Sequence, residues 1–213
     1  MLCGIDEAGR GSVLGPLVVG AVYAEDDTIF RDIGVKDSKQ LTPNERELMF
    51  DQIIDAASSH SVSIITAEDI DKRRKNASLN NIELDMFVEV ASKLPVVKVY
   101  ADCLYINENI FSNVLSFKLG SIRVIGRHKA DEIYPIVSAA SIVAKVTRDR
   151  MIQDIAAEFD ADVGSGYPSD PTTMNFIKEW MKKNGTPPKY TRNTWEHIHR
   201  LSIIHANTKI TDW

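Results

Sequence analysis

The sequence is poor in cysteine and has no long apolar run. Among its 213 residues, only Cys3 and Cys103 are cysteines. Two widely separated cysteines supply neither a disulfide framework nor the ligands of a zinc site, so we expect reduced structural thiols. No run of about 18 apolar residues is present, which excludes a membrane-spanning helix. The chain opens on a strand-like stretch instead of a signal-peptide pattern, and we therefore expect a cytoplasmic protein with no membrane association.

An excess of positive charge is also missing. The sequence has 30 Asp and Glu against 25 Lys and Arg, for a net charge of -5. This balance argues against a protein that coats nucleic acid non-specifically. It does not exclude a nuclease, because carboxylates around a metal lower the net charge while local basic patches hold phosphates. Two such patches occur, at residues 72–75 and along the tail from Lys178 to Arg200. A solvated helix face is the simpler interpretation of each patch.

The stretch from Gly4 to Pro16 holds the residues that are best suited to bind a metal ion or a substrate. It places Asp6 and Glu7 at the end of an apolar strand, before a glycine-rich loop. Ionised carboxylates are costly to bury unless they are paired or bind a metal, so we expect a hard divalent cation beside them. The flexible loop lets a polymer approach closely, and Arg10 offers a guanidinium to a phosphate. A dinucleotide-binding loop is excluded, because Pro16 and a β-branched run follow where that motif needs a helix.

Apolar periodicity predicts an α/β fold with a mixed central sheet flanked by helices. The 44% hydrophobic content is enough for a substantial core. The predicted strands are 2–6, 17–22, 62–66, 96–104 and 122–125, of which the first two form a hairpin. One predicted helix begins at Thr42 and Pro43 with a capping box, and others span 79–94, 136–159 and 172–183. A last short helix is expected in the tail around 195–199.

Further carboxylates follow two of the later strands. Asp102 interrupts an apolar strand near its end, where an isolated acidic side chain needs a partner such as a cation. Asp131 follows the next strand. Together with Asp6 and Glu7 they come from three separated segments, as a pair of hard metal ions that cleaves a phosphodiester requires. Spacing alone is weak evidence among 30 acidic residues, and ordinary salt bridges or helix caps are the alternative.

Several longer motifs resemble the type 2 ribonuclease H family, ribonuclease HII. The resemblance runs in order over nearly the whole chain, and the Arg-Asn-Thr-Trp sequence at 192–195 looks more like the archaeal branch. The motifs that carry the resemblance are Gly4 to Gly11, Gly15-Pro16, Asp37 to Lys39, Ala101-Asp102, Lys129 to Asp131, Ser138 to Arg150 and Gly164 to Pro168.

The resemblance implies a ribonuclease H-like fold with a catalytic domain over 1–163 and a small C-terminal helical extension over 164–213 that contributes to substrate binding. It implies a metal-dependent endonuclease that hydrolyses the RNA strand of RNA–DNA hybrids. It also implies cleavage 5′ of single ribonucleotides embedded in duplex DNA. Two Mg2+ or Mn2+ ions would serve as cofactors, and the products would carry 3′-hydroxyl and 5′-phosphate ends.

The resemblance also assigns roles to individual residues. The metal-binding and catalytic carboxylates of the family match Asp6, Glu7, Asp102 and Asp131. The loop whose backbone recognises the 2′-hydroxyl matches Gly9, Arg10 and Gly11. Tyr167 matches the tyrosine that packs on the sugar beside the junction. Lys39 and Lys145 are further candidates that would hold phosphates or neutralise the carboxylates, and for Lys39 an ordinary surface role is the alternative.

Some residues of these motifs admit a structural interpretation. Asp149 is the alternative to Asp131 as fourth carboxylate, but it lies well inside a long predicted helix beside Arg148, so we interpret it as part of an ion pair. His197 and His199 suggest a general base, which two metal ions make unnecessary, so we interpret them as ordinary surface or core residues.

Two other functional classes stay open at the level of the sequence. A different nuclease of the same fold, such as a junction resolvase or a DNA exonuclease, would carry an acidic cluster without requiring a 2′-hydroxyl. A non-catalytic nucleic-acid binding module is disfavoured by the acidic balance and by the absence of a basic, aromatic-lined groove. We expect a monomer whose partners are RNA–DNA hybrids and ribonucleotide-containing duplex DNA.

Overall fold

The computed structural model describes residues 1–35 and 41–211, with side chains up to residue 204. Over these residues the chain forms two compact units, each assembled from segments that are distant in the sequence. The first consists of Met1–Ala8, Val18–Ile64 and Ser78–Thr147, and the second of Gly9–Leu17, Ile65–Ala77 and Arg148–Trp213. The predicted division into residues 1–163 and an extension over 164–213 stays a prediction.

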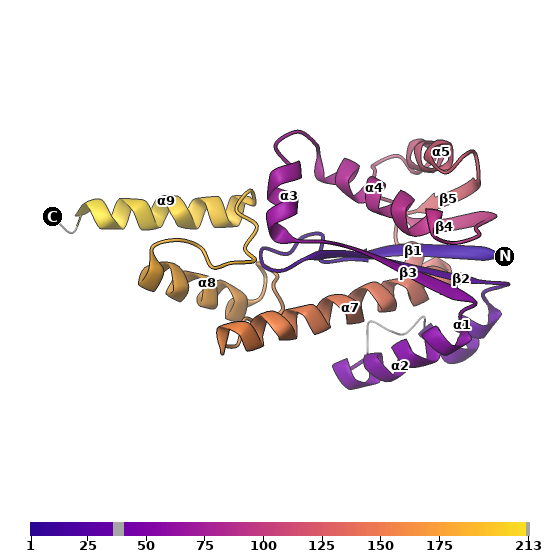
Figure 1. Cartoon of the computed structure of the whole chain (residues 1–213), viewed down its shortest axis with the longest axis horizontal. Helices are drawn as coiled ribbons and strands as arrows, with labels where there is room; N and C mark the ends of the chain where they lie inside the picture. The colour runs from indigo at the N-terminus through magenta and orange to yellow at the C-terminus, as the bar shows by residue number, and fades with distance from the viewer. Residues whose placement is uncertain (36–40, 212–213) are drawn as a thin grey trace. The chain divides into compact units, whose positions relative to one another are not determined.

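A mixed five-stranded sheet organises the first unit (Figure 1). Its strands are β1 (Leu2–Ala8), β2 (Leu17–Ala24), β3 (Ser59–Ile65), β4 (Lys98–Asp102) and β5 (Arg123–Arg127). They lie in the order β3-β2-β1-β4-β5. β1 pairs with β2 in the antiparallel sense and with β4 in the parallel sense, and β4 is parallel to β5. The mixed sheet and the opening hairpin are therefore confirmed, whereas the strand predicted over 96–104 is shorter at both ends.

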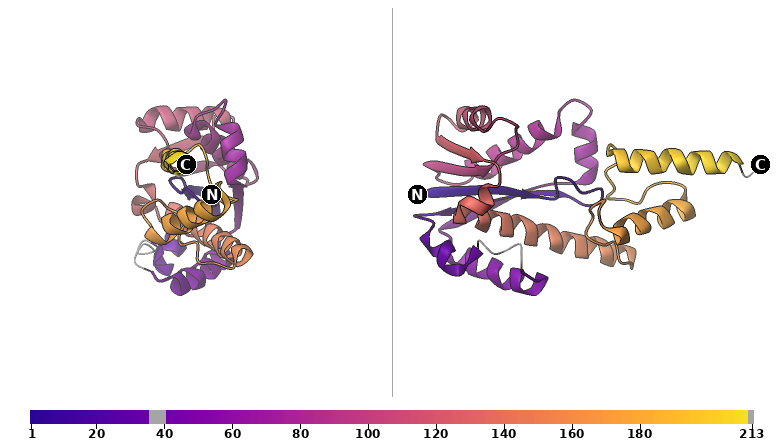
Figure 2. Two further views of the ribbon diagram at one scale, coloured as in Figure 1. Left: turned by 90° about the vertical axis from the view of Figure 1, so that its left-hand side faces the viewer. Right: turned by 180° about the vertical axis from the view of Figure 1, so that it is seen from behind.

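Helices cover both faces of this sheet (Figures 1 and 2). They are α1 (Thr28–Ile33), α2 (Pro43–Ala56), α4 (Leu79–Ser92), α5 (Glu108–Lys118), α6 (Ala130–Ile133) and the first half of α7 (Pro135–Phe159). Helices α4 and α5 lie on one face, and α1, α2 and α7 lie on the other. The capping box predicted for α2 is present, because Thr42 and Glu45 each bind the backbone N–H of the other.

Helix α7 packs unusually close to the sheet. A Cβ atom added to Gly4 of β1 would lie 2.1 Å from the carbonyl oxygen of Ile136, and one added to Gly20 of β2 would lie 2.7 Å from that of Ala140. Glycine is required at both strand positions because helix backbone occupies the space of a side chain. The small residues at the start of α7 allow the same close helix–sheet packing.

The second unit contains α3 (Ala67–Arg73), the rest of α7, α8 (Pro171–Asn184) and α9 (Glu196–Thr211). Helix α8 begins at the N-cap Asp170 with proline at its first position, and it ends at Gly185 in the left-handed conformation. The unit has two small apolar clusters. Val13 packs with Ile177, Met181 and Ile198, and Leu14 packs with side chains from the second half of α7. The residues between β1 and β2 are thus part of this core.

Several elements differ from the predictions. Helices α1, α5 and α6 have no counterpart among the predicted elements, and the short tail helix is in fact the 16-residue α9. Within the described residues, none of the helices combines the length and the apolar character needed to cross a membrane.

Candidate active site

Three carboxylates meet at one edge of the sheet in the first unit. Asp6 and Glu7 lie near the end of β1, and Asp102 is the last residue of β4. These strands are parallel neighbours, and the pairing of Ile5 with Ala101 brings the next residue of each, Asp6 and Asp102, to the same level. An oxygen atom from each of the three carboxylates lies within 4.8 Å of the others. Carboxylate oxygens are the ligands that hard divalent cations prefer, so the arrangement fits a Mg2+ or Mn2+ ion.

The cluster is electrostatically unfavourable without a cation. Burial raises the pKa of Asp6 well above its usual value, and the negative charges of Glu7 and Asp102 raise it further. Hydrogen bonds from the Ser141 side chain and the Glu7 backbone N–H oppose this shift in pKa. Burial also raises the pKa of Asp102. Both shifts favour the protonated forms, and a bound cation would instead stabilise the ionised forms.

Asp131 lies next to this cluster but does not belong to the group within 4.8 Å. It occupies the first turn of α6, where the preceding residue, Ala130, donates its backbone N–H to Asp102 Oδ1 at 2.9 Å. The negative charge of Asp131 adds to the raised pKa of Asp102. The structure therefore brings three of the four predicted carboxylates together and holds the fourth beside Asp102. The role of Asp131 as a metal ligand stays a prediction.

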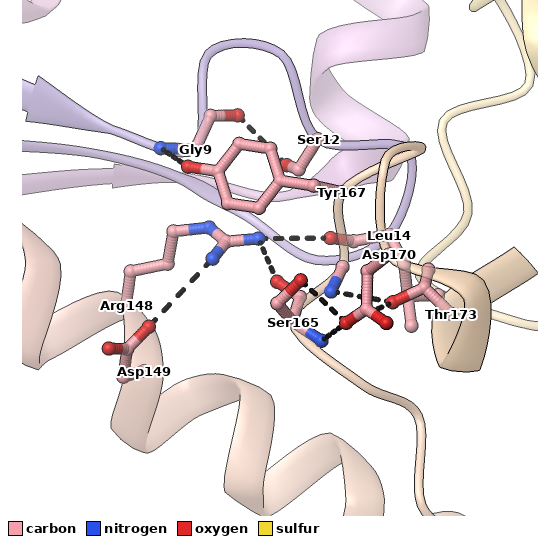
Figure 3. Close-up of polar contacts among 10 residues, drawn as sticks. Gly9, Ser12, Leu14, Arg148, Asp149, Ser165, Tyr167, Asp170 and Thr173 are labelled. Atoms are coloured by element: carbon pink, nitrogen blue, oxygen red, sulfur yellow. Dashed lines mark hydrogen bonds and ion pairs between the residues drawn. The ribbon is translucent and has the colours of Figure 1, made fainter. Parts of the chain in front are cut away.

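The glycine loop belongs to the second unit, where Tyr167 contacts it directly (Figure 3). The backbone N–H of Gly9 donates to Tyr167 Oη at 3.1 Å, and the Ser12 hydroxyl donates to the Gly9 carbonyl at 2.8 Å. The Tyr167 ring lies against Arg148, whose guanidinium carbon is 4.7 Å from the ring centroid. The structure thus joins Gly9 and Tyr167, two residues that the sequence related only through the family resemblance.

The structure constrains the two glycines beside Arg10 differently. Gly9 has a φ of +91°, and a Cβ there would lie 2.4 Å from Arg148 Nε and 2.6 Å from the Pro16 carbonyl oxygen. Gly11 is exposed, does not have a positive φ, and would place its Cβ where no heavy atom lies within 4 Å. The loop conformation therefore requires glycine at position 9 but not at position 11.

Among the other residues that the sequence singled out, the structure describes Lys145, Asp149, His197 and His199. Lys39 falls outside the described residues. Lys145 is half-buried in the first half of α7. In the second unit, Asp149 Oδ1 lies 3.9 Å from Arg148 Nη1, the ion pair that the sequence predicted. His197 and His199 are exposed on α9.

Two residues of the basic cluster at 72–75 contact other residues of the same unit. Lys72 Nζ lies 2.8 Å from Glu68 Oε1 on the same helix, and Arg74 lies over the Trp195 ring at 4.8 Å. Lys72 therefore lies on a solvated helix face, as the simpler interpretation predicts. Arg74 instead packs on Trp195, a contact that the local sequence does not reveal.

The sequence did not indicate that the Ser141 side chain binds Asp6, or that Arg148 and Arg192 are buried. An arginine within the apolar spacing of α7 was the available signal for Arg148.

Known proteins match this chain over almost its whole length. The model of the Ribonuclease HII family matches residues 3–198. Ribonuclease HII of Pyrococcus abyssi is 45% identical, covering 99% of this chain and 95% of the relative. Ribonuclease HII of Methanospirillum hungatei is 41% identical, and the alignment covers 100% of both chains.

Solved structures give the same result for the fold. Ribonuclease H2 from Pyrococcus horikoshii has a TM-score of 0.89 at 41% identity, covering 96% of this chain and 98% of that chain. Ribonuclease HII from Archaeoglobus fulgidus, solved in a complex with PCNA, has a TM-score of 0.89 at 39% identity, with coverage of 94% and 96%. The predicted ribonuclease H-like fold is confirmed, and the protein is a hydrolase. With the family model matched over residues 3–198, the chain belongs to the ribonuclease HII family.

Proposed function

We propose that this protein is an endonuclease that hydrolyses the RNA strand of RNA–DNA hybrids and cuts 5′ of single ribonucleotides in duplex DNA. The cluster of Asp6, Glu7 and Asp102 is the observation that carries the proposal, because it supplies an oxygen-ligand site in a chain of the ribonuclease HII family. The expected products carry 3′-hydroxyl and 5′-phosphate ends.

We propose Mg2+ or Mn2+ as the cofactor, bound in pairs by Asp6, Glu7, Asp102 and Asp131. A ribonuclease HIII that is 19% identical to this chain has been solved with Mn2+, and that likeness supports the fold alone. When bound, such ions activate water and stabilise the leaving oxygen of a phosphodiester. The chain itself orients the ligands, because Ser141 and the Glu7 N–H bind Asp6 and the Ala130 N–H binds Asp102.

Recognition of the ribose is proposed for the glycine loop. The backbone around Gly9, Arg10 and Gly11 would bind the 2′-hydroxyl, which distinguishes RNA from DNA. The open space at Gly11 supports this role, since a sugar can approach the backbone there. Tyr167, fixed to the loop through Gly9, would pack on the sugar beside the junction. Lys39 and Lys145 are proposed to hold substrate phosphates, and a cytoplasmic monomer stays our prediction.

The test uses three labelled duplexes of one sequence: an RNA–DNA hybrid, a DNA duplex with one ribonucleotide, and an all-DNA duplex. Each is incubated with Mg2+, Mn2+ or EDTA, and the cut is mapped. We expect metal-dependent cleavage of the first two duplexes, 5′ of the lone ribonucleotide in the second. Cleavage of the all-DNA duplex would favour a different nuclease of this fold, and binding without cleavage in either metal would favour a non-catalytic module.

Asp102→Asn tests the metal centre within the same assay. It removes one ligand charge and retains the shape of the side chain, so folding and hybrid binding should be kept while cleavage is lost. Asp51→Asn on the exposed side of α2 is the matched control, and it should cut at the wild-type rate. Wild-type cleavage by Asp102→Asn at saturating Mn2+ would contradict the assignment of Asp102.

A further inference from the structure

Arg148 and Arg192 are the largest side chains that are fully buried in the described part of the chain. Arginine remains charged in a protein, and a buried charge is costly unless its N–H groups are hydrogen-bonded. Both residues belong to the second unit, whereas the carboxylate cluster belongs to the first. The contacts of Arg192 indicate what this buried charge does.

Arg192 holds the glycine loop at three points. Its backbone N–H donates to the Val13 carbonyl at 2.8 Å. Its guanidinium donates through Nε to the Gly15 carbonyl at 3.1 Å and through Nη1 to the Arg10 carbonyl at 3.1 Å. The guanidinium is a rigid planar fork, so the carbonyls of Arg10 and Gly15 are fixed relative to one another.

Together with two other hydrogen bonds, the bonds of Arg192 fix the backbone beside Gly11. The N–H of Gly9 is bound to Tyr167, and the Gly9 carbonyl accepts from Ser12. With the Arg10 carbonyl held by Arg192, the peptide groups that precede Gly11 are oriented by side chains. Gly11 itself is exposed and faces open space. The loop therefore presents a preorganised backbone to whatever approaches Gly11.

The segment after Arg192 is anchored in turn by α3. Asp71 accepts the backbone N–H groups of Asn193 at 2.7 Å and Thr194 at 3.1 Å. The Trp195 ring lies 4.9 Å from the Arg192 guanidinium carbon and 4.8 Å from that of Arg74. A line of contacts thus runs from α3 through residues 193–195 to Arg192 and the glycine loop.

We infer that Arg192 is a positioning residue for ribose recognition, which fixes the backbone of the glycine loop in the orientation that receives a 2′-hydroxyl. The inference rests on the proposed function of Gly9, Arg10 and Gly11. A deoxyribose has no 2′-hydroxyl, so the positioning affects ribonucleotide-containing duplexes and not all-DNA duplexes. Loss of stability alone would affect both duplexes equally, which separates the two explanations.

The test is Arg192→Lys, which keeps the positive charge and replaces the planar fork by a single ammonium group. Dissociation constants without divalent metal are measured for a DNA duplex with one ribonucleotide and for the all-DNA duplex, and their ratio is the ribose preference. The value of kcat on the first duplex is measured with Mn2+, at a temperature where circular dichroism shows each variant folded. Trp180→Ala, which removes ring contacts with Phe159 and Phe176 in the same unit, is the control for lost stability.

We expect Arg192→Lys to lower kcat by about 10- to 100-fold, the effect of misplacing a recognition group. It should also reduce the ribose preference and leave the all-DNA affinity unchanged, whereas Trp180→Ala should keep the preference. A folded Arg192→Lys protein with wild-type preference and kcat would overturn the inference, as would an equal loss of affinity for both duplexes.

A second variant covers the case in which Arg192→Lys does not fold. Asp71 is a surface residue of α3, and Asp71→Ala loosens residues 193–194 without touching the loop. It should lower the ribose preference by a smaller factor, and an unchanged preference would then overturn the inference. A wild-type protein that neither prefers nor cuts the ribonucleotide duplex would refute the proposed function itself, and the inference with it.

Discussion

Replacing Gly11 by alanine should affect folding stability and substrate cleavage in opposite directions. The new methyl group meets no heavy atom within 4 Å, and the residue does not have a positive φ. Alanine also restricts the unfolded chain, so the free energy of unfolding should rise by about 0.4–1 kcal/mol. The same methyl group lies where we propose that the ribose approaches. Forcing a methyl group into a packed contact destabilises it by about 1–3 kcal/mol, which lowers kcat/KM by about 5- to 150-fold.

Gly9→Ala is the matched comparison, two residues away. At a φ of +91° the left-handed conformation alone costs an alanine about 1–2 kcal/mol. Its methyl group would also lie 2.4 Å from Arg148 Nε, so the free energy of unfolding should fall. Urea denaturation followed by circular dichroism measures stability, and initial rates on a single-ribonucleotide duplex measure kcat/KM. The reasoning is refuted if Gly11→Ala unfolds as easily as Gly9→Ala, or if it cuts at the wild-type rate.

Further predictions concern packing, ligand orientation and the thiols. Gly4→Ala should abolish folding or lower the thermal midpoint steeply, since its methyl group would lie 2.1 Å from the Ile136 carbonyl oxygen; a midpoint near that of the wild type would contradict this close packing. Ser141→Ala should raise the Mn2+ concentration needed for half-maximal cleavage by about 10- to 100-fold, because Asp6 loses an orienting hydrogen bond; an unchanged concentration would exclude this role. Burial raises the pKa of Cys3 to about 12, so iodoacetamide at pH 8 should modify it only after unfolding. The unfolded thiol ionises near pH 8.5, so this thiol should lower the stability as the pH rises from about 8.5 to 12, and Cys3→Ala should flatten that dependence.

The sequence predicts those features that depend on local patterns. The capping box at Thr42, the opening hairpin and the long helix α7 follow from residues close together in the chain. Helix α5 was missed although Phe111 and Leu115 are buried one helical turn apart, and Phe117, which departs from that face, is exposed. The strand predicted over 96–104 ends earlier because the chain turns after Asp102.

The candidate site was predictable only in part for a related reason. The meeting of Asp6 with Asp102 depends on the pairing of β1 with β4, which no local pattern specifies. The family resemblance, and not spacing, selected these residues among the 30 acidic ones. Arg192 illustrates the opposite error, since a charged residue in a polar tail is expected at the surface. It is buried because the carbonyls of a loop from the start of the chain accept its N–H groups.

The pairing of β1 with β4 also has a consequence for synthesis on the ribosome. β1 is made before its parallel partner β4, which ends at Asp102, so one edge of β1 stays unpaired while the hairpin of β1 and β2 forms. An exposed, apolar strand edge invites pairing with other chains, and slow parallel pairing prolongs that exposure. The carboxylates of the two strands come together only when β4 docks. A nascent chain released before Asp102 therefore lacks one of the three clustered carboxylates and is prone to aggregate.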